Sequence, residues 1–451
     1  FIHGGGFLMG MAAPPIYDGT HLARTQDVVV VTIQYRFGPF GLLDLSASPT
    51  AEQPFETNLG LRDQIAALRW VRRNIAAFGG DPDNATVFGE SAGGTSVLAL
   101  LASPAAKGLF AAAIAESPAP ELIVDRATAR VIADEFLRLL DDPARKPGAP
   151  HGAGPFPGGR ARELLARASG DDIHGAGKKL MDFAQKTDIG VFLPLAPIVG
   201  DDILPQSPLR AAHAGTTHPV PLIIGNNREE GALFSRFFDL TPAVEKTVRA
   251  LAGTDGDEAI RGVYRDHKRD RSRLSGDFLF WGPTSVFVDG HSAVAATYHY
   301  RYDYVTRLLK ASGFGATHTT EMLAVFGSLK TYVAGFLAIA DWRAVRRPCG
   351  EGPWGRLRPA RQPRHRLARL HHRRPAGPDH RRPEPGRYRP RRGAAGGVAA
   401  AALSRCGLSG ALGHRVSRLV ACAPRASTGG GWGVGQRVVH TRRRPMMRQT
   451  T

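Results

Sequence analysis

Residues 84–95 read Asn-Ala-Thr-Val-Phe-Gly-Glu-Ser-Ala-Gly-Gly-Thr, and this stretch decides the fold class. A short apolar run predicts a strand over 85–88, and helix-forming residues follow directly from Ala92. Between them, glycines two positions on either side of Ser91 allow a strand to turn sharply into a helix. A chance glycine-rich turn is the alternative, which the strand before it and the helix after it disfavour. The G-x-S-x-G pattern therefore indicates a serine nucleophile at the end of a strand.

The surrounding segments alternate between strands and helices. A continuous β-branched run at 26–35 predicts a strand that is covered on both faces of a parallel sheet. An amphipathic helix is predicted over 58–78, where apolar residues recur at spacings of three and four: Leu61, Ile65, Leu68, Val71, Ile75 and Phe78. The resulting βαβα order predicts an α/β fold with a mostly parallel central sheet, flanking helices and right-handed crossovers.

A glycine-rich loop, His3-Gly-Gly-Gly-Phe7, lies close to the start of the chain. Consecutive glycines let backbone N–H groups point into a cavity, where they can bind a developing negative oxygen. The donors we expect are the N–H groups of Gly5, Gly6 and Ala92, although such a loop on its own could simply be flexible. Because the chain starts within what reads as a buried strand, we infer that the first strands and any targeting signal are missing. The compartment is left open between cytoplasmic and secreted.

The charge of the chain is concentrated in its last quarter. The whole sequence has a net charge of +19, yet residues 346–451 contain 25 Arg, no Lys and 3 acidic residues. The same segment lacks Phe, Ile and Asn, so it cannot bury enough apolar surface to order itself, and we expect it to be disordered. We therefore predict an α/β domain over 1–345 and an Arg/Pro/Gly/Ala-rich tail over 346–451.

Two origins of this tail are considered. Its residues share GC-rich codons, so one hypothesis is a shift of reading frame near residue 346, which sequencing of the locus would test. The alternative is a basic arm that binds nucleic acid. Because almost no aromatic side chains are available for base stacking, we expect no nucleic-acid partner.

Cysteine and hydropathy exclude several further classes. All three cysteines, Cys349, Cys406 and Cys422, lie in the tail, so residues 1–345 contain neither a disulfide nor a thiol nucleophile. No run of 18 or more apolar residues is present, so no membrane span is expected.

Six short motifs occur in a fixed order along the first hundred residues: 3–7, 17–19, 35–36, 58–64, 78–82 and 89–94. With these motifs the sequence resembles the type B carboxylesterase family, the cholinesterase-like branch of the α/β-hydrolase fold. The similarity continues to about Trp342 and covers some three quarters of the chain. Two departures are evident, because the family's N-terminal region is absent and its closing helical segment is unrecognisable after Arg346.

A serine nucleophile needs a base, and the base needs an orienting carboxylate, which in this fold follow the serine in the order acid, then histidine. Glu230 comes directly after an apolar strand and matches the family's acid, with Glu229 as its neighbour. His318 follows a strand over 297–302 and lies in a segment that resembles the family pattern H-x-x-E-x-x-x-x-F-G. The alternatives are a solvated pair of carboxylates and a structural histidine. The resemblance favours Ser91, Glu230 and His318 as the catalytic residues.

The resemblance also implies supporting residues. Ser117 lies at the position of a buried serine that supports the acid, and Glu90 is similar to the carboxylate beside the nucleophile; ordinary packing is the alternative for both. Helical cap segments are expected within 125–190 and 234–281. Aromatic side chains that could line an apolar gorge are Phe237, Phe238, Phe278, Phe280 and Trp281.

We therefore expect a carboxylic-ester hydrolase that works through an acyl-enzyme, with a small-molecule ester and water as its partners. No metal or organic cofactor is implied. Two alternatives are a cholinesterase-like domain that only binds partners and a degraded gene product that does not fold. A related enzyme branch, similar to hormone-sensitive lipase, normally has Asp before the serine and as the acid, whereas both positions are Glu here. The acyl and alcohol groups of the ester and the oligomeric state are not determined by the sequence.

Overall fold

The structure is a computed structural model that describes residues 1–46, 55–150, 155–187, 189, 191–236, 244, 262–264, 267–327 and 439–440. All of them belong to one compact unit, Phe1–Pro348 with Leu412–Thr451. The predicted tail at 346–451 lies outside the described residues, apart from the two-residue strand β7, and its disorder remains a prediction. Phe237 and Phe238 also lie outside them.

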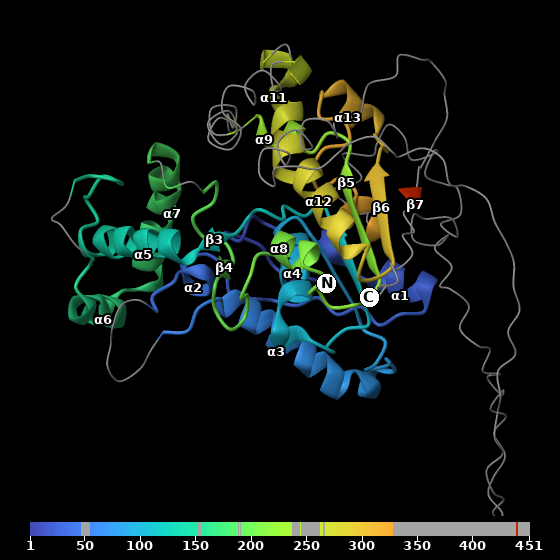
Figure 1. Ribbon diagram of the computed structural model, residues 1–451, viewed down its shortest axis with the longest axis horizontal. Helices are drawn as coiled ribbons and strands as arrows, with labels where there is room; N and C mark the ends of the chain where they lie inside the picture. Colours follow the sequence, from blue (N-terminus) through green and yellow to red (C-terminus); the bar gives the residue numbers. More distant parts are fainter. Residues whose placement is uncertain are drawn as a thin grey trace, which may run out of the picture. The chain divides into compact units, whose positions relative to one another are not determined.

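A five-stranded sheet forms the centre of this unit (Figure 1). The strand order is β1-β2-β5-β6-β7, in which the first four strands are parallel and β7 is antiparallel to β6. A separate pair of short parallel strands is formed by β3 and β4. The strands are β1 (Thr86–Glu90), β2 (Ala112–Glu116), β3 (Val124–Asp125), β4 (Ile198–Val199), β5 (Leu222–Asn227), β6 (Thr297–Tyr302) and β7 (Val439–His440). The predicted α/β-hydrolase arrangement is confirmed.

Helices connect the parallel strands. The α-helices are α1 (Thr20–Gln26), α2 (Pro39–Leu42), α3 (Leu59–Asn74), α4 (Ala92–Ala102), α5 (Arg126–Asp141), α6 (Gly158–Arg167), α7 (Gly170–Lys186), α8 (Pro208–His213), α9 (Gly231–Phe234), α11 (His267–Gly276), α12 (Gly282–His291), α13 (Arg307–Ala311) and α14 (Met322–Val325). Tighter or wider turns are η1 (Pro15–Tyr17), η2 (Ile75–Phe78), η3 (Pro104–Ala106) and the π-turn η4 (Asp277–Trp281).

Helix α4 is the centre of the hydrophobic core. Every residue from Ala92 to Ala102 is buried, as expected for a helix that is apolar on all sides. It contacts β1 and β2 and also α3 and α8. The strand before it and the helix itself therefore fix the turn at Ser91 from both sides.

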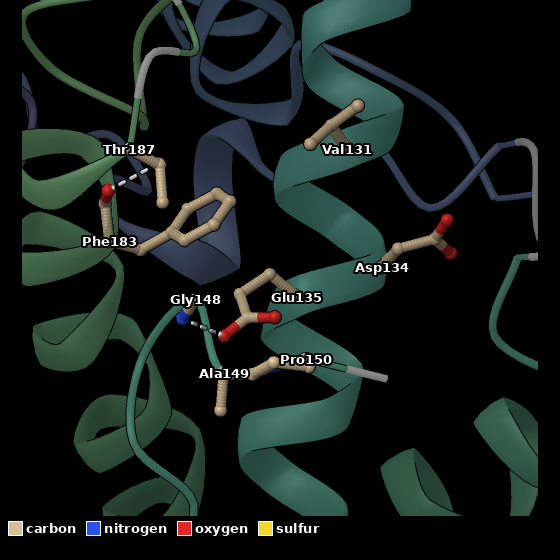
Figure 2. A pocket seen from close by; sticks show the side chains of 8 residues that line it. All are labelled: Val131, Asp134, Glu135, Gly148, Ala149, Pro150, Phe183 and Thr187. Atoms are coloured by element: carbon tan, nitrogen blue, oxygen red, sulfur yellow. Dashed lines mark hydrogen bonds between the residues drawn. The ribbon is translucent and has the colours of Figure 1, made fainter. Parts of the chain in front are cut away.

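Helices α5, α6 and α7 form the predicted first cap segment; they lie together in Figure 1, and α5 contacts the short strands β3 and β4. Helix α7 begins at Gly170, where Ser169 and Asp172 form a reciprocal capping box. A hollow of about 420 Å³ lies in this layer (Figure 2), where the buried Glu135 accepts a hydrogen bond from the N–H of Gly148 at 2.8 Å. None of the predicted site residues lines it: its walls are Val131, Asp134, Glu135, Gly148, Ala149, Pro150, Phe183 and Thr187.

Two expectations about the core are wrong. Residues 26–35 do not form a strand covered on both faces: only Ile33 makes a bridge, to Ile2, and Val28 and Val29 are exposed. A β-branched run favours an extended backbone, but a strand is covered on both faces only where it joins the sheet and helices pack on either side of it. The helix predicted over 58–78 is present as α3 followed by the 3₁₀ turn η2, but Phe78, predicted on its apolar face, is exposed against Trp70 instead of buried.

Gly93 should be intolerant of any side chain. A Cβ there would lie 2.0 Å from the carbonyl oxygen of Ile2, which is backbone and cannot move aside. We expect Gly93→Ala to lower the free energy of unfolding by about 3 kcal/mol or more, measured by denaturant unfolding.

Gly159→Ala is the matched control, because Gly159 also lies in a helix but a Cβ added there would have nothing within 4 Å. There alanine should be neutral or stabilise by up to about 1 kcal/mol. Equal effects of the two substitutions would contradict the packing described around Ser91.

Candidate active site

Ser91 occupies a strained turn between β1 and α4. Its φ is +57° and its ψ −121°, a combination that side chains rarely adopt. The turn is held by the Ser91 N–H, which donates to the carbonyl of Glu116 at 2.9 Å, and by the N–H of Thr95, which donates to the carbonyl of Ser91 at 2.8 Å. The predicted strand, turn and helix are thus present, and Ser91 remains partly exposed while its neighbours are buried.

The glycine loop at residues 4–6 packs against this turn. A Cβ on Gly4 would lie 3.1 Å from the Cβ of Ser91 and 2.8 Å from Oε2 of Glu90, so only glycine fits there. Gly5 and Gly6 have φ values of +111° and +62°. Within the described part of the chain, no group accepts a hydrogen bond from the N–H of Gly5, Gly6 or Ala92. The three N–H groups predicted as donors therefore remain available.

His3 supports the loop from behind. It is fully buried, its Nδ1 lies 2.8 Å from the carbonyl oxygen of Gly4, and its ring stacks on Tyr35 with 4.5 Å between centroids. The hydroxyl of Tyr35 donates to the carbonyl of His3 at 3.0 Å. Burial lowers the pKa of His3 and outweighs the contact with Gly4, so the ring is neutral and structural.

His318 and Glu230 lie in direct contact although 88 residues separate them. Nδ1 of His318 is 2.6 Å from Oε2 of Glu230, and both side chains are buried. The other oxygen of Glu230 accepts the backbone N–H of Asn227 at 2.6 Å, which fixes the carboxylate at the end of β5. Because parallel strands end at one edge of the sheet, β5 and β1 deliver Glu230 and Ser91 to the same edge.

The second ring nitrogen of His318 faces Glu90. Nε2 lies 3.4 Å from Oε1 of Glu90, and neither atom has a hydrogen-bond partner among the described residues. Burial alone lowers the pKa of His318, but the carboxylates of Glu90 and Glu230 outweigh it and raise the pKa to about 9. Burial raises the pKa of Glu90 to about 7, with His318 opposing the shift. The imidazole thus lies between two carboxylates.

Ser117 has a different partner from the one expected. It is fully buried, but its hydroxyl donates to Oε1 of Glu321 at 2.7 Å rather than to Glu230. Its connection to Glu230 is indirect, because the side chain of Asn227 contacts the Ser117 hydroxyl at 3.2 Å while the N–H of Asn227 holds Glu230. The reason is geometric: Ser117 follows β2, and the short turn into α14 brings Glu321 nearer to it.

Glu321 is a residue that the sequence analysis missed. Its second oxygen accepts the hydroxyl of Tyr300 at 2.8 Å. Burial and then the charge of Glu230 raise the pKa of Glu321, while its two hydrogen bonds oppose the shift. The signal was present in the H-x-x-E pattern, in which Glu321 follows His318 by three positions, but the pattern alone gave it no role.

Aromatic rings cover His318. The centroids of Phe280 and Phe234 lie 4.7 and 5.0 Å from that of the imidazole, and the two phenyl rings stack on each other at 5.6 Å. Trp281 donates its indole N–H to the carbonyl of Asn227 at 3.0 Å, which makes it a support of the acid's segment. Phe278 packs instead in a small cluster with Val244, Tyr264 and Leu274. Of the predicted gorge residues that the structure describes, Phe278, Phe280 and Trp281, Phe280 is the one whose ring packs on His318.

Neither a cluster of metal ligands nor a membrane-spanning helix is found within the described ranges. No group of three or more His, Cys, Asp or Glu side chains in them could hold a metal ion. No helix in them is long and apolar enough to cross a membrane.

The fold and the serine turn define an α/β-hydrolase, and comparison with known proteins gives the family. A sequence profile described as "Carboxylesterase family" matches residues 1–332. The chain belongs to the carboxylesterase family.

Individual relatives agree with this assignment. The chain is 38% identical to the para-nitrobenzyl esterase of Bacillus subtilis over 337 residues, and 31% identical to the mouse bile salt-activated lipase over 367 residues. These alignments cover 73% and 72% of this chain and 63% and 57% of the relatives. The chain thus spans somewhat less than two thirds of the length of these relatives.

Solved structures show the same relation. A thermophilic para-nitrobenzyl esterase superposes with a TM-score of 0.61 at 36% identity, covering 73% of this chain and 64% of that one. A Geobacillus stearothermophilus carboxylesterase superposes with a TM-score of 0.58 at 33% identity, covering 73% and 65%.

The position of His318 between two carboxylates predicts its titration. The pKa should lie well above the ordinary value near 6.5, and Glu90→Gln should lower it, because that substitution removes one of the negative charges that favour the imidazolium. NMR titration with labelled histidine measures both values.

His218 is the internal reference, since burial lowers its pKa and Glu90 is not among the groups that shift it. An unchanged His318 pKa in Glu90→Gln, or a wild-type pKa below 6.5, would contradict the described geometry.

Proposed function

We propose that this chain is a serine carboxylic-ester hydrolase in which Ser91 is the nucleophile, His318 the general base and Glu230 the orienting acid. The observation that carries the proposal is the 2.6 Å contact between His318 Nδ1 and Glu230, combined with the strained turn at Ser91. Membership of the carboxylesterase family supports the same reaction class.

In the first half of the reaction, Nε2 of His318 takes the proton of the Ser91 hydroxyl while the oxygen attacks the ester carbonyl. Glu230 keeps the Nδ1 proton in place and stabilises the imidazolium that forms. His318 then returns the proton to the departing alcohol. Water, activated by the same histidine, hydrolyses the acyl-enzyme in the second half.

The oxyanion that forms on the carbonyl would be bound by the N–H groups of Gly5, Gly6 and Ala92. The positive φ of both glycines and the close packing of Gly4 against Ser91 support this placement. Removing one such donor in other enzymes costs about 3 to 4 kcal/mol of barrier, so the loop is a major part of the catalytic power.

The pH dependence follows from the charges around His318. Catalysis needs the neutral imidazole, and the carboxylates of Glu90 and Glu230 raise the pKa of His318 to about 9. The active fraction of the free enzyme therefore grows as the pH rises through neutrality, so kcat/KM increases toward the alkaline side.

Small apolar carboxylic esters are the substrate class that we propose. The rings of Phe234 and Phe280 pack on His318 and make the surroundings of the proposed base apolar, which suits an apolar ester. The relative named for para-nitrobenzyl esters supports an aryl or alkyl ester of this kind.

Replacement of Ser91 tests the proposal. Ser91→Ala should reduce the hydrolysis of p-nitrophenyl acetate and butyrate by roughly 10⁴-fold or more, because the acyl-enzyme cannot form. The measurement is the steady-state rate of p-nitrophenolate release by the purified full-length chain.

The matched control is Ser292→Ala, which removes a hydroxyl whose one hydrogen-bond partner among the described residues is the carbonyl of Asp289 at the end of α12. This variant should keep the wild-type rate. Equal rates for wild type and Ser91→Ala would rule out the proposed function.

A further inference from the structure

We propose that Glu229, the neighbour of the orienting acid, is a positioning residue that holds the backbone of the His318 loop against the end of β5. The proposal rests on the function proposed above, since it concerns the same base. It assigns different tasks to two consecutive glutamates: Glu230 orients the imidazole ring, and Glu229 holds the segment that carries it.

Two hydrogen bonds join Glu229 to the residue two positions before His318. The N–H of Glu229 donates to the carbonyl of Ala316 at 2.9 Å, and the N–H of Ala316 donates to Oε2 of Glu229 at 2.7 Å. Glu229 also forms a parallel bridge with Thr317. Both the backbone and the side chain of Glu229 thus bind the loop. The carboxylate accepts the N–H of Ala316, a task that a backbone carbonyl would have if a full strand lay there.

The fit of the loop around this carboxylate is close. A Cβ on Gly315 would lie 2.9 Å from both Cδ and Oε2 of Glu229, and Gly315 has a φ of +63°. Ala316 is fully buried, so a loss of the side-chain acceptor would leave its N–H without a partner in the protein. The side chain therefore reaches the loop at a point where backbone geometry admits only glycine.

The loop has a second attachment farther from the histidine. Arg236 donates to the carbonyl of Ser312 at 2.7 Å, and its guanidinium lies 4.4 Å from the ring centroid of Phe314. Glu229 acts on 315–317, immediately before His318, and so controls the last three residues. The other oxygen of Glu229 accepts Arg228 Nε in a partly exposed ion pair.

The consequence concerns the transition state rather than substrate binding. A displacement of about 1 Å in a catalytic group can cost on the order of 100-fold in rate. Glu229 does not contribute to the pKa shift of His318, whose causes are burial, Glu90, Glu230 and Glu321. Its effect should therefore depend on the reach of the side chain and not on its charge.

Three substitutions separate reach from charge. Glu229→Ala removes the acceptor, Glu229→Asp keeps the charge but is one methylene too short, and Glu229→Gln keeps the reach and an acceptor oxygen without the charge. We expect kcat to fall by about 10- to 100-fold in Glu229→Ala and Glu229→Asp, with KM unchanged. In Glu229→Gln, kcat should remain within about 3-fold of wild type.

Two controls remove comparable ion pairs without touching the loop. Asp303 accepts Arg301 at 2.7 Å and is 31% exposed, close to the 33% of Glu229, so Asp303→Ala matches a lost surface pair. Arg228→Ala breaks the pair of Glu229 itself while leaving the contact with Ala316. Both should retain wild-type kcat, because exposed pairs contribute little.

A structural readout accompanies the kinetics. Hydrogen exchange at the Ala316 amide should be faster in Glu229→Ala and Glu229→Asp than in Glu229→Gln and the wild type. The proposal is overturned if Glu229→Asp has the wild-type kcat while Glu229→Gln is as slow as Glu229→Ala. It is also overturned if all three variants keep the wild-type kcat and the wild-type exchange rate at Ala316. If Glu229→Ala does not fold, the kcat values of Glu229→Asp and Glu229→Gln still separate the effect of side-chain length from that of charge. Absence of Ser91-dependent hydrolysis in the wild type would refute the proposed function. Exchange at the Ala316 amide would still test whether Glu229 holds the His318 loop.

Discussion

The hydrogen bond between His318 and Glu230 is the constraint on which the rest of the site depends. It joins a loop after β6 to the end of β5 and closes a gap of 88 residues with one 2.6 Å contact between buried groups. A buried imidazole and a buried carboxylate are each costly alone, so either one without the other would be unstable in this position. Fold and site are thus coupled: the parallel sheet aligns the strand ends, and the pair holds the loop there.

Several buried glutamate side chains belong to the same region as this pair. Glu90, Glu116, Glu230 and Glu321 are all buried, and burial is the largest cause of the raised pKa values of Glu90, Glu116 and Glu321. The groups divide by their partners: Glu321 accepts two hydroxyls, whereas both oxygens of Glu116 lack a hydrogen bond from any described residue. Raised pKa values favour the neutral forms of Glu116 and Glu321, so Glu90 and Glu230 are the main groups that favour a positive charge on His318, the charge that the proposed base would acquire.

Local sequence patterns predicted more of this structure than did the apolar character of whole segments. The strand, turn and helix around Ser91 and the strand over 297–302 could be predicted, because periodicity and glycine spacing are local properties. The burial of the run at 26–35 could not be predicted, since a β-branched sequence does not say whether the segment pairs within the sheet or whether helices cover its faces. The partner of Ser117 and the task of Glu321 depend on how β2, β6 and the loop before α14 meet, and no local signal contains that.

Trapping of the covalent intermediate shows whether Ser91 is the nucleophile. The purified chain is mixed with p-nitrophenyl butyrate, quenched in acid within the first turnover and digested, and the peptides are examined by mass spectrometry. We expect a butyryl group on the peptide that contains Ser91 and no such group in Ser91→Ala. Ester hydrolysis that proceeds with no acyl group on Ser91, or with one on another residue, would contradict it.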